Sequence, residues 1–92
     1  MLGKIEDFGM LLYLTSILYD TTQIKKYYFP ETKEIAEIFI SAMKDLKCET
    51  DLDKRAKSIL KLAFVELKEA HTISDGVFKV LNSTRLEYLN ND

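Results

Sequence analysis

A long helical repeat over residues 51–71 constrains the fold more than any other feature of the sequence. The inward-facing positions recur at intervals of three and four for about five turns. These positions are Leu52, Ala56, Ile59, Leu60, Ala63, Phe64, Leu67, Ala70 and His71. Lysines occupy the opposite side, and Thr50 or Asp51 can cap the first free backbone N–H groups, with Asp53 near the positive helix end. The pattern predicts an amphipathic helix of about twenty residues.

Two further segments have helical patterns. After Pro30 and Glu31, which suit a first helical turn, one stripe is formed by Ile35, Ile38, Phe39, Ala42, Met43 and Leu46, and Ala36 and Ile40 widen it. The last segment begins at Ser74 or Asp75. Its apolar side is looser, because Thr84 and Arg85 interrupt Val77, Phe78, Val80, Leu81, Leu86, Tyr88 and Leu89.

An uncharged run extends from Phe8 to Tyr19. Twelve helical residues span about 18 Å, whereas a bilayer core is about 30 Å thick, so the run is too short for a membrane span. It lacks the lysine-rich face of a membrane-surface helix and the basic start and cleavage site of a signal peptide. We therefore expect a helix from Gly3 or Lys4 to Thr22 or Ile24 that other helices cover.

Together these segments predict an all-α fold, an antiparallel four-helix bundle formed as a single helical domain over residues 1–92. The connections are short, which favours antiparallel neighbours. The chain has only 3 Gly and 1 Pro, and no segment alternates like a strand. A single cysteine excludes an internal disulfide and suits a reducing compartment, so we expect a cytoplasmic protein.

The residues that could carry chemistry do not form a recognisable catalytic or metal-binding pattern. Cys48 lies near the predicted end of the second helix, where the helix dipole opposes a thiolate, and His71 suits the end of the third helix. The acids Glu49, Asp51 and Asp53 are explained by a capped helix start, because basic residues follow where a calcium loop needs ligands. We expect no enzyme activity, no metal and no cofactor.

The segment Lys25, Lys26, Tyr27, Tyr28 and Phe29 is the candidate partner contact. Three consecutive aromatic rings cannot all face one core from a helix, and tyrosine and phenylalanine are enriched at interface cores. The alternative is structural, with Phe29 as an N-terminal staple and the tyrosines packed at the joint. Nucleic acid is disfavoured, because 13 basic and 15 acidic residues leave a net charge of -2.

Three stretches resemble one protein family. They are ILYDTTQ (Ile17 to Gln23), the helix opened by Pro30, and KLAFVELKEAHTISDG (Lys61 to Gly76). Their layout is similar to the small immunity proteins, of the enterocin A type, that protect bacteria from their own pediocin-like bacteriocins. The resemblance implies an antiparallel four-helix bundle without enzymatic activity. It also implies contact with a membrane permease complex from the cytoplasmic side, through the C-terminal half of the chain.

The sequence therefore leaves three classes of function open. The first is a protein-binding bundle of immunity type, and the second is a homo-oligomeric regulator or adaptor of phage or plasmid type, for which a homodimer is expected. The third, a nucleic-acid binder, is the least favoured by the acidic net charge.

Overall fold

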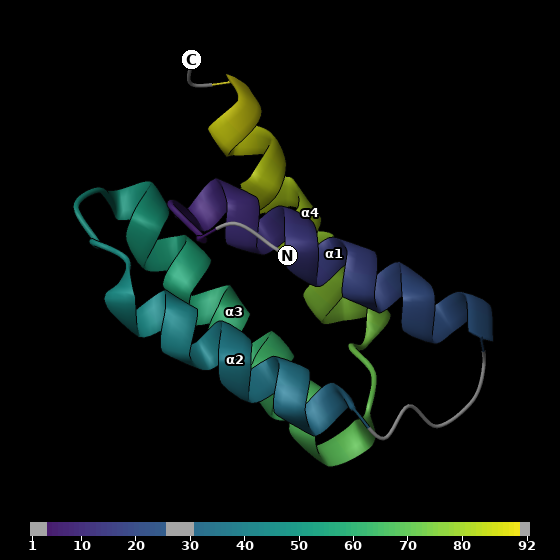
Figure 1. Cartoon of the computed structure of the whole chain (residues 1–92). Helices are drawn as coiled ribbons and strands as arrows, with labels where there is room; N and C mark the ends of the chain where they lie inside the picture. Colours follow the sequence, from purple (N-terminus) through teal and green to yellow (C-terminus); the bar gives the residue numbers. More distant parts are fainter. Residues whose placement is uncertain (1–3, 26–30, 91–92) are drawn as a thin grey trace.

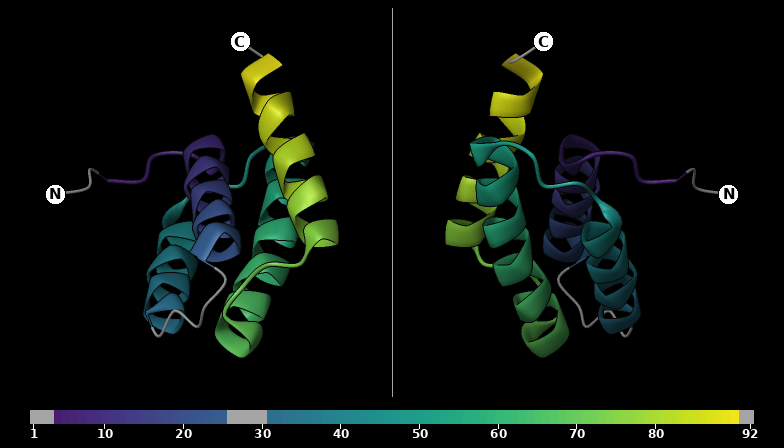
Figure 2. Two further views of the ribbon diagram at one scale, coloured as in Figure 1. Left: turned by 90° about the vertical axis from the view of Figure 1, so that its right-hand side faces the viewer. Right: turned by 90° about the vertical axis from the view of Figure 1, so that its left-hand side faces the viewer.

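The computed structural model describes residues 4–25 and 31–90, which form four α-helices. The helices are α1 (Phe8–Lys25), α2 (Thr32–Asp45), α3 (Asp51–Ala70) and α4 (Asp75–Asn90). They run alternately up and down the bundle, with α1 and α2 in front of α3 and α4 (Figure 1). The side views show the two layers edge on (Figure 2). The predicted all-α, antiparallel four-helix bundle is confirmed.

The core lies between the layers and combines aliphatic side chains with aromatic pairs. Its fully covered members include Leu11, Leu12, Leu60, Phe64, Leu67, Ile73 and Leu81. Phe64 of α3 meets Phe39 of α2 with ring centroids 5.9 Å apart. Tyr19 of α1 stacks on Phe78 of α4 at 4.0 Å, and the Tyr19 hydroxyl donates a hydrogen bond to Asp75. Helix α3 contacts the other three helices and α2 has only slight contact with α1.

Helix α1 begins at Phe8, four or five residues later than the predicted start at Lys4 or Gly3. The carboxylate of Asp7 accepts a hydrogen bond from the backbone N–H of Met10 at 2.7 Å. This places Asp7 at the N-cap of α1. Thr15 and Thr22 are buried because their hydroxyls bond to carbonyl oxygens of the preceding turn, so polar residues in the uncharged run are compatible with burial.

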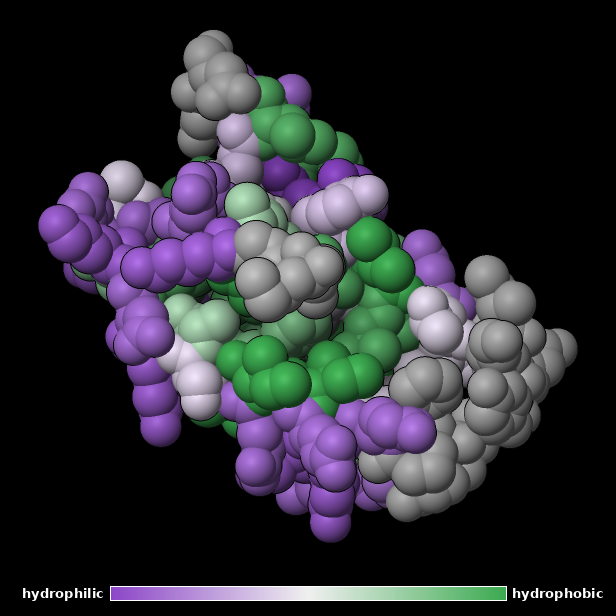
Figure 3. Space-filling model, in the orientation of Figure 1, coloured by the Kyte–Doolittle hydropathy of each residue, from purple (hydrophilic) through white to green (hydrophobic). Residues whose placement is uncertain are grey.

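The predicted stripe of α2 is partly wrong. Ala36 is fully buried, whereas Ile38 is 62% exposed. The reason is that α2 packs mainly on α3 and only slightly on α1, so no other described helix covers the edge of the stripe that includes Ile38. The front face carries apolar side chains around α1 and α2 (Figure 3).

The predicted start, length and apolar side of α3 are confirmed. The Thr50 hydroxyl accepts from the Asp53 N–H at 3.0 Å, and the Asp53 carboxylate accepts from the Thr50 N–H at 3.2 Å. This reciprocal capping box ties down two N–H groups at the start of the helix. Ala70 is the exception on the predicted inner side, because it is exposed in the last turn. His71 follows in the left-handed conformation, with φ of 62°.

Helix α4 begins where expected, and Val77, Phe78, Leu81 and Tyr88 of its predicted apolar side contact the core, but the rest of that side does not. Its N-cap is Ser74, whose hydroxyl accepts from the Val77 N–H at 3.4 Å. Thr84, predicted to interrupt the apolar side, is buried, and its hydroxyl bonds to the Val80 carbonyl at 2.8 Å. Val80, Leu86 and Leu89 are instead exposed. The helix therefore presents Leu81, Thr84 and Tyr88 inward, since among the described helices it packs on α1 and α3.

The described helices were also compared with the requirements of a membrane span. None of those over residues 4–25 and 31–90 combines sufficient length with sufficient apolar character to cross a bilayer.

Candidate functional site

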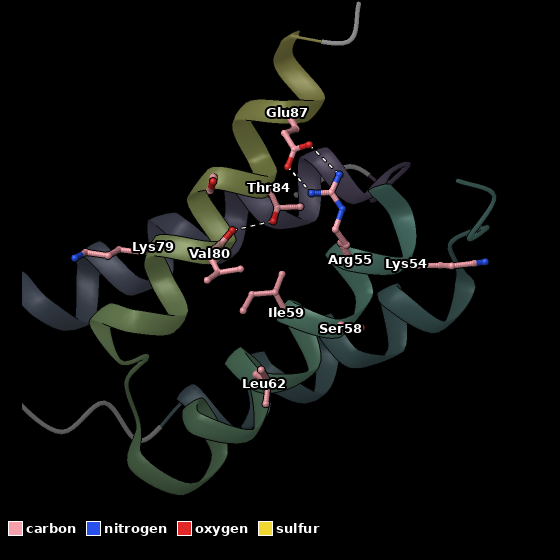
Figure 4. A pocket seen from close by; sticks show the side chains of 10 residues that line it. Lys54, Arg55, Ser58, Ile59, Leu62, Lys79, Val80, Thr84 and Glu87 are labelled. Carbon is pink, nitrogen blue, oxygen red and sulfur yellow. Dashed lines mark hydrogen bonds and ion pairs between the residues drawn. The ribbon is translucent and has the colours of Figure 1, made fainter. Parts of the chain in front are cut away.

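A groove lies between α3 and α4 on the surface of the described chain. We call it the α3/α4 groove, and it has a volume of about 710 Å³. Its lining residues are Lys54, Arg55, Ser58, Ile59 and Leu62 from α3 and Lys79, Val80, Ser83, Thr84 and Glu87 from α4. Figure 4 shows these side chains on the two antiparallel helices.

Small side chains at the facing positions explain why the two helices leave a groove. Ser58 of α3 and Ser83 of α4 are too short to fill the space between the helices on the outer side of their contact. Below them, Ile59 is 5% exposed and Thr84 is buried, so the floor is closed. The helices thus touch along their inner edges and separate toward solvent.

Two apolar side chains are exposed on the walls. Leu62 is 56% exposed on α3 and Val80 is 53% exposed on α4. The close-up shows Leu62 and Val80 on opposite helices, with Ile59 near the centre of the groove (Figure 4). Isolated exposed apolar residues are normal on protein surfaces. Two that line one concave site over a buried floor are a stronger sign of an interaction surface.

An ion pair closes one end of the groove. The Arg55 guanidinium donates two hydrogen bonds to the Glu87 carboxylate, at 2.7 and 2.8 Å. This pairing raises the pKa of Arg55 and lowers the pKa of Glu87. The two parallel hydrogen bonds hold both side chains in one orientation, although the pair is exposed to solvent.

The remaining charges of the groove are positive. Lys54 and Lys79 lie at its opposite ends and their ammonium groups point outward (Figure 4). Neither forms a salt bridge within the described part of the chain. Because the charges of Arg55 and Glu87 cancel each other, the rim is left with two lysines and no unpaired acid.

The groove is lined by apolar, hydroxyl and charged side chains. Its lining has neither cysteine nor histidine to supply a nucleophile or a base near neutral pH. Ser58 and Ser83 have no such base among the other lining residues. An apolar centre between polar ends is instead the arrangement that accommodates apolar side chains of another helix.

The residues predicted to contact a partner fall mostly outside the described structure. Lys26, Tyr27, Tyr28 and Phe29 lie outside the described residues, and Lys25 ends α1 with a side chain that is also outside the description. The prediction that this segment contacts a partner stays untested. The groove lies elsewhere, on the C-terminal half of the chain.

The structure separates Cys48 from His71. Cys48 is exposed in the connection that precedes α3, and His71 caps the far end of that helix. A helix of 20 residues spans about 30 Å, so the two side chains cannot form a nucleophile–base pair. The Nδ1 atom of His71 is 2.7 Å from the Thr32 hydroxyl, which joins the end of α3 to the start of α2.

The acidic start of α3 serves the helix cap. Asp53 accepts from the backbone N–H groups of Glu49 and Thr50 and from the Tyr88 hydroxyl of α4. Burial acts to raise the pKa of Asp53, but these hydrogen bonds outweigh it and lower the pKa below its ordinary value. Burial and the bond to Asp53 raise the pKa of Tyr88. Among the described residues, no group of three or more acids, cysteines or histidines is placed to hold a metal ion.

Sequence reasoning missed the groove, although signals for it exist. Leu62 interrupts the lysine-rich side of the third predicted helix, lying next to Lys61. A large apolar residue on a polar face requires either a neighbour or a partner. Val80 was assigned to the core, and only the register of α4 shows that it lies at the edge.

Comparison with protein-family models, with curated proteins and with solved structures found no match for this chain.

Proposed function

We propose that this chain is a non-enzymatic helical module that binds another protein through the α3/α4 groove. The observation that carries the proposal is the pair of exposed side chains, Leu62 and Val80, above the closed floor of the groove. Each holds apolar surface in water that a bound partner would cover, and burial of such surface drives association.

The geometry favours an amphipathic helix as the docked element. Two antiparallel helices form the walls, and a third helix laid along them presents anchors at intervals of three and four residues. Such an apolar face would cover Leu62 and Val80, while polar groups at its ends would meet Lys54 and Lys79.

As the specific process, we propose bacteriocin immunity. Two observations support it: the four-helix fold is the one that the family resemblance implies, and the groove lies in the C-terminal half. In this proposal the chain contacts a membrane permease complex from the cytoplasmic side and protects the cell from a pediocin-like bacteriocin.

The test is protection of a sensitive bacterium that expresses the chain. Cells are challenged with a panel of pediocin-like bacteriocins, and the inhibitory concentration is measured. The wild type is expected to raise this concentration for at least one member of the panel. The double variant Leu62→Gln/Val80→Gln is expected to lose the protection at an equal level of folded protein.

Ile38→Gln is the matched control, because Ile38 is as exposed as the groove residues but lies on α2. It is expected to protect like the wild type. Full protection by the groove variant would contradict the role of the groove. Failure of the wild type against the whole panel would contradict the immunity proposal.

A further inference from the structure

Helix α1 carries an exposed apolar ridge on its outer side. Met10, Tyr13 and Ile17, which we call the α1 ridge, are all exposed and are spaced at i, i+3 and i+7. This spacing aligns them along one face of the helix, opposite to buried Phe8 and Thr15. The ridge is therefore an apolar strip exposed to solvent, and its Met10 and Tyr13 also line a pocket with Arg85, Tyr88 and Leu89 of α4.

Acidic residues flank the α1 ridge at both ends. Glu6 precedes it and Asp20 follows it, and both are exposed. Neither forms a salt bridge within the described ranges 4–25 and 31–90. Arg85 of α4 borders the middle of the ridge, with its guanidinium carbon 5.9 Å from the centre of the Tyr13 ring. The ends of the ridge are thus negative, whereas those of the α3/α4 groove are positive.

The two surfaces also agree in length. The seven-residue separation of Met10 and Ile17 corresponds to about 10 Å along a helix. The eight-residue separation of Lys54 and Leu62 along the groove wall corresponds to about 12 Å. An α1 ridge laid in the groove would place its apolar residues over Leu62 and Val80 and its acidic ends near Lys54 and Lys79.

We propose that the α3/α4 groove binds the α1 ridge of a second copy of this chain. The ridge and the groove are different surfaces, so the contact is head-to-tail and each added copy leaves one ridge and one groove free. Association therefore continues past a dimer unless the chain of copies closes into a ring. This inference rests on the proposed function, because it takes the groove as a helix-docking site.

Self-association gives the groove an occupant in the absence of a partner. A partner helix must then displace the ridge of the second copy, so the two binding events compete. Protection or partner binding is expected to be accompanied by dissociation of the assembly, since one groove cannot hold both helices.

Sedimentation equilibrium of the purified chain at low salt, over a wide concentration range, tests the proposal. The wild type is expected to show a mass that rises with concentration beyond two copies. Asp20→Lys and the double variant Lys54→Glu/Lys79→Glu are each expected to weaken association about tenfold, because attraction between exposed charges becomes repulsion. An equimolar mixture of the two variants is expected to associate as pairs, since the Asp20→Lys chain keeps an unchanged groove and the double variant keeps an unchanged ridge.

Charge changes on α2 serve as matched controls. Glu34→Lys and the double variant Lys33→Glu/Lys44→Glu alter exposed residues that belong to neither surface. They are expected to associate like the wild type. A wild type that stays monomeric at every concentration overturns the inference, as does association that both sets of variants leave unchanged.

The two proposals fail separately. A monomeric chain whose groove variant loses protection would overturn self-association alone. A self-associating chain whose Leu62→Gln/Val80→Gln variant still protects would overturn the proposed function of the groove alone.

Discussion

The two flanks of α3 differ in how their neighbours cover them. Toward α2, Phe64 is buried against Phe39, and Lys68 reaches Glu37 at 3.6 Å across the outer edge. Toward α4, Ile59 is buried but Leu62, three residues later, is exposed. The difference follows from the facing side chains, because an aromatic ring fills the α2 side while Ser83 leaves the α4 side open. One helix thus has a closed flank that stabilises the fold and an open flank available for binding.

The largest loss of stability is expected in α1, where a covered and an exposed residue are also neighbours. Leu18→Asp places a charge at a buried position and is expected to unfold the protein, since the carboxylate has no partner there. Ile17→Asp makes the same change at an exposed neighbour and is expected to remain folded. Circular dichroism with thermal melting compares the two. Equal melting temperatures would remove the distinction between covered and open positions.

The closed flank of α3 itself is tested by Phe64→Ala. Removing the buried ring is expected to lower the free energy of unfolding by about 3 to 4 kcal/mol, because it leaves a cavity against Phe39. Urea denaturation measures the change. Phe64→Leu, which keeps most of the volume, should cost much less. A loss under about 1 kcal/mol for the alanine variant would mean that this flank is not tightly packed.

A smaller loss of stability is expected from a change at the N-terminal cap of α3. Asp53→Asn is expected to lower stability by about 1 kcal/mol at neutral pH through a weaker capping box. The folded-state pKa of Asp53 is below its ordinary 3.8, so the charged carboxylate stabilises the fold above about that pH. This contribution is lost as the pH falls through the lowered pKa, so the wild type and the variant should converge in acid.

Asp51→Asn is the control for this prediction. It removes the same charge from the same helical turn but does not belong to the capping box. Its stability should follow the wild type more closely across the pH range. A difference between wild type and Asp53→Asn that persists unchanged at the lowest pH would contradict the assigned role of the carboxylate.

The smallest effect is expected on the open flank. Leu62→Gln and Val80→Gln should each change the free energy of unfolding by no more than about 0.5 kcal/mol, because both side chains are mostly in water already. Urea denaturation of the two single variants checks this. A loss comparable to that of Phe64→Ala would mean that the groove residues belong to the core, and the contrast between the flanks would disappear.

The sequence by itself determined the features that depend on neighbours along the chain. Thr50 and Asp53 lie three residues apart and cap their own helix, so the start of α3 was predicted correctly. The helical period of residues 51–71 placed its buried side for the same reason. The start of α1 was missed because the helix was extended back to Gly3 or Lys4, whereas Asp7 caps it and α1 begins at Phe8, with the uncharged run itself.

Only the tertiary structure decided which apolar residues are covered and which remain open. Ile38, expected on the covered stripe, is exposed because α2 has one close neighbour instead of two, whereas Ala36 on the widened apolar face is buried. Thr84 turns inward and Val80 lies at an edge because α4 packs on α1 and α3. The groove, the α1 ridge and their complementary charges arise from residues distant in sequence. Helical periodicity fixes the direction of a side chain relative to its own helix, whereas burial depends on the size and position of the facing helix.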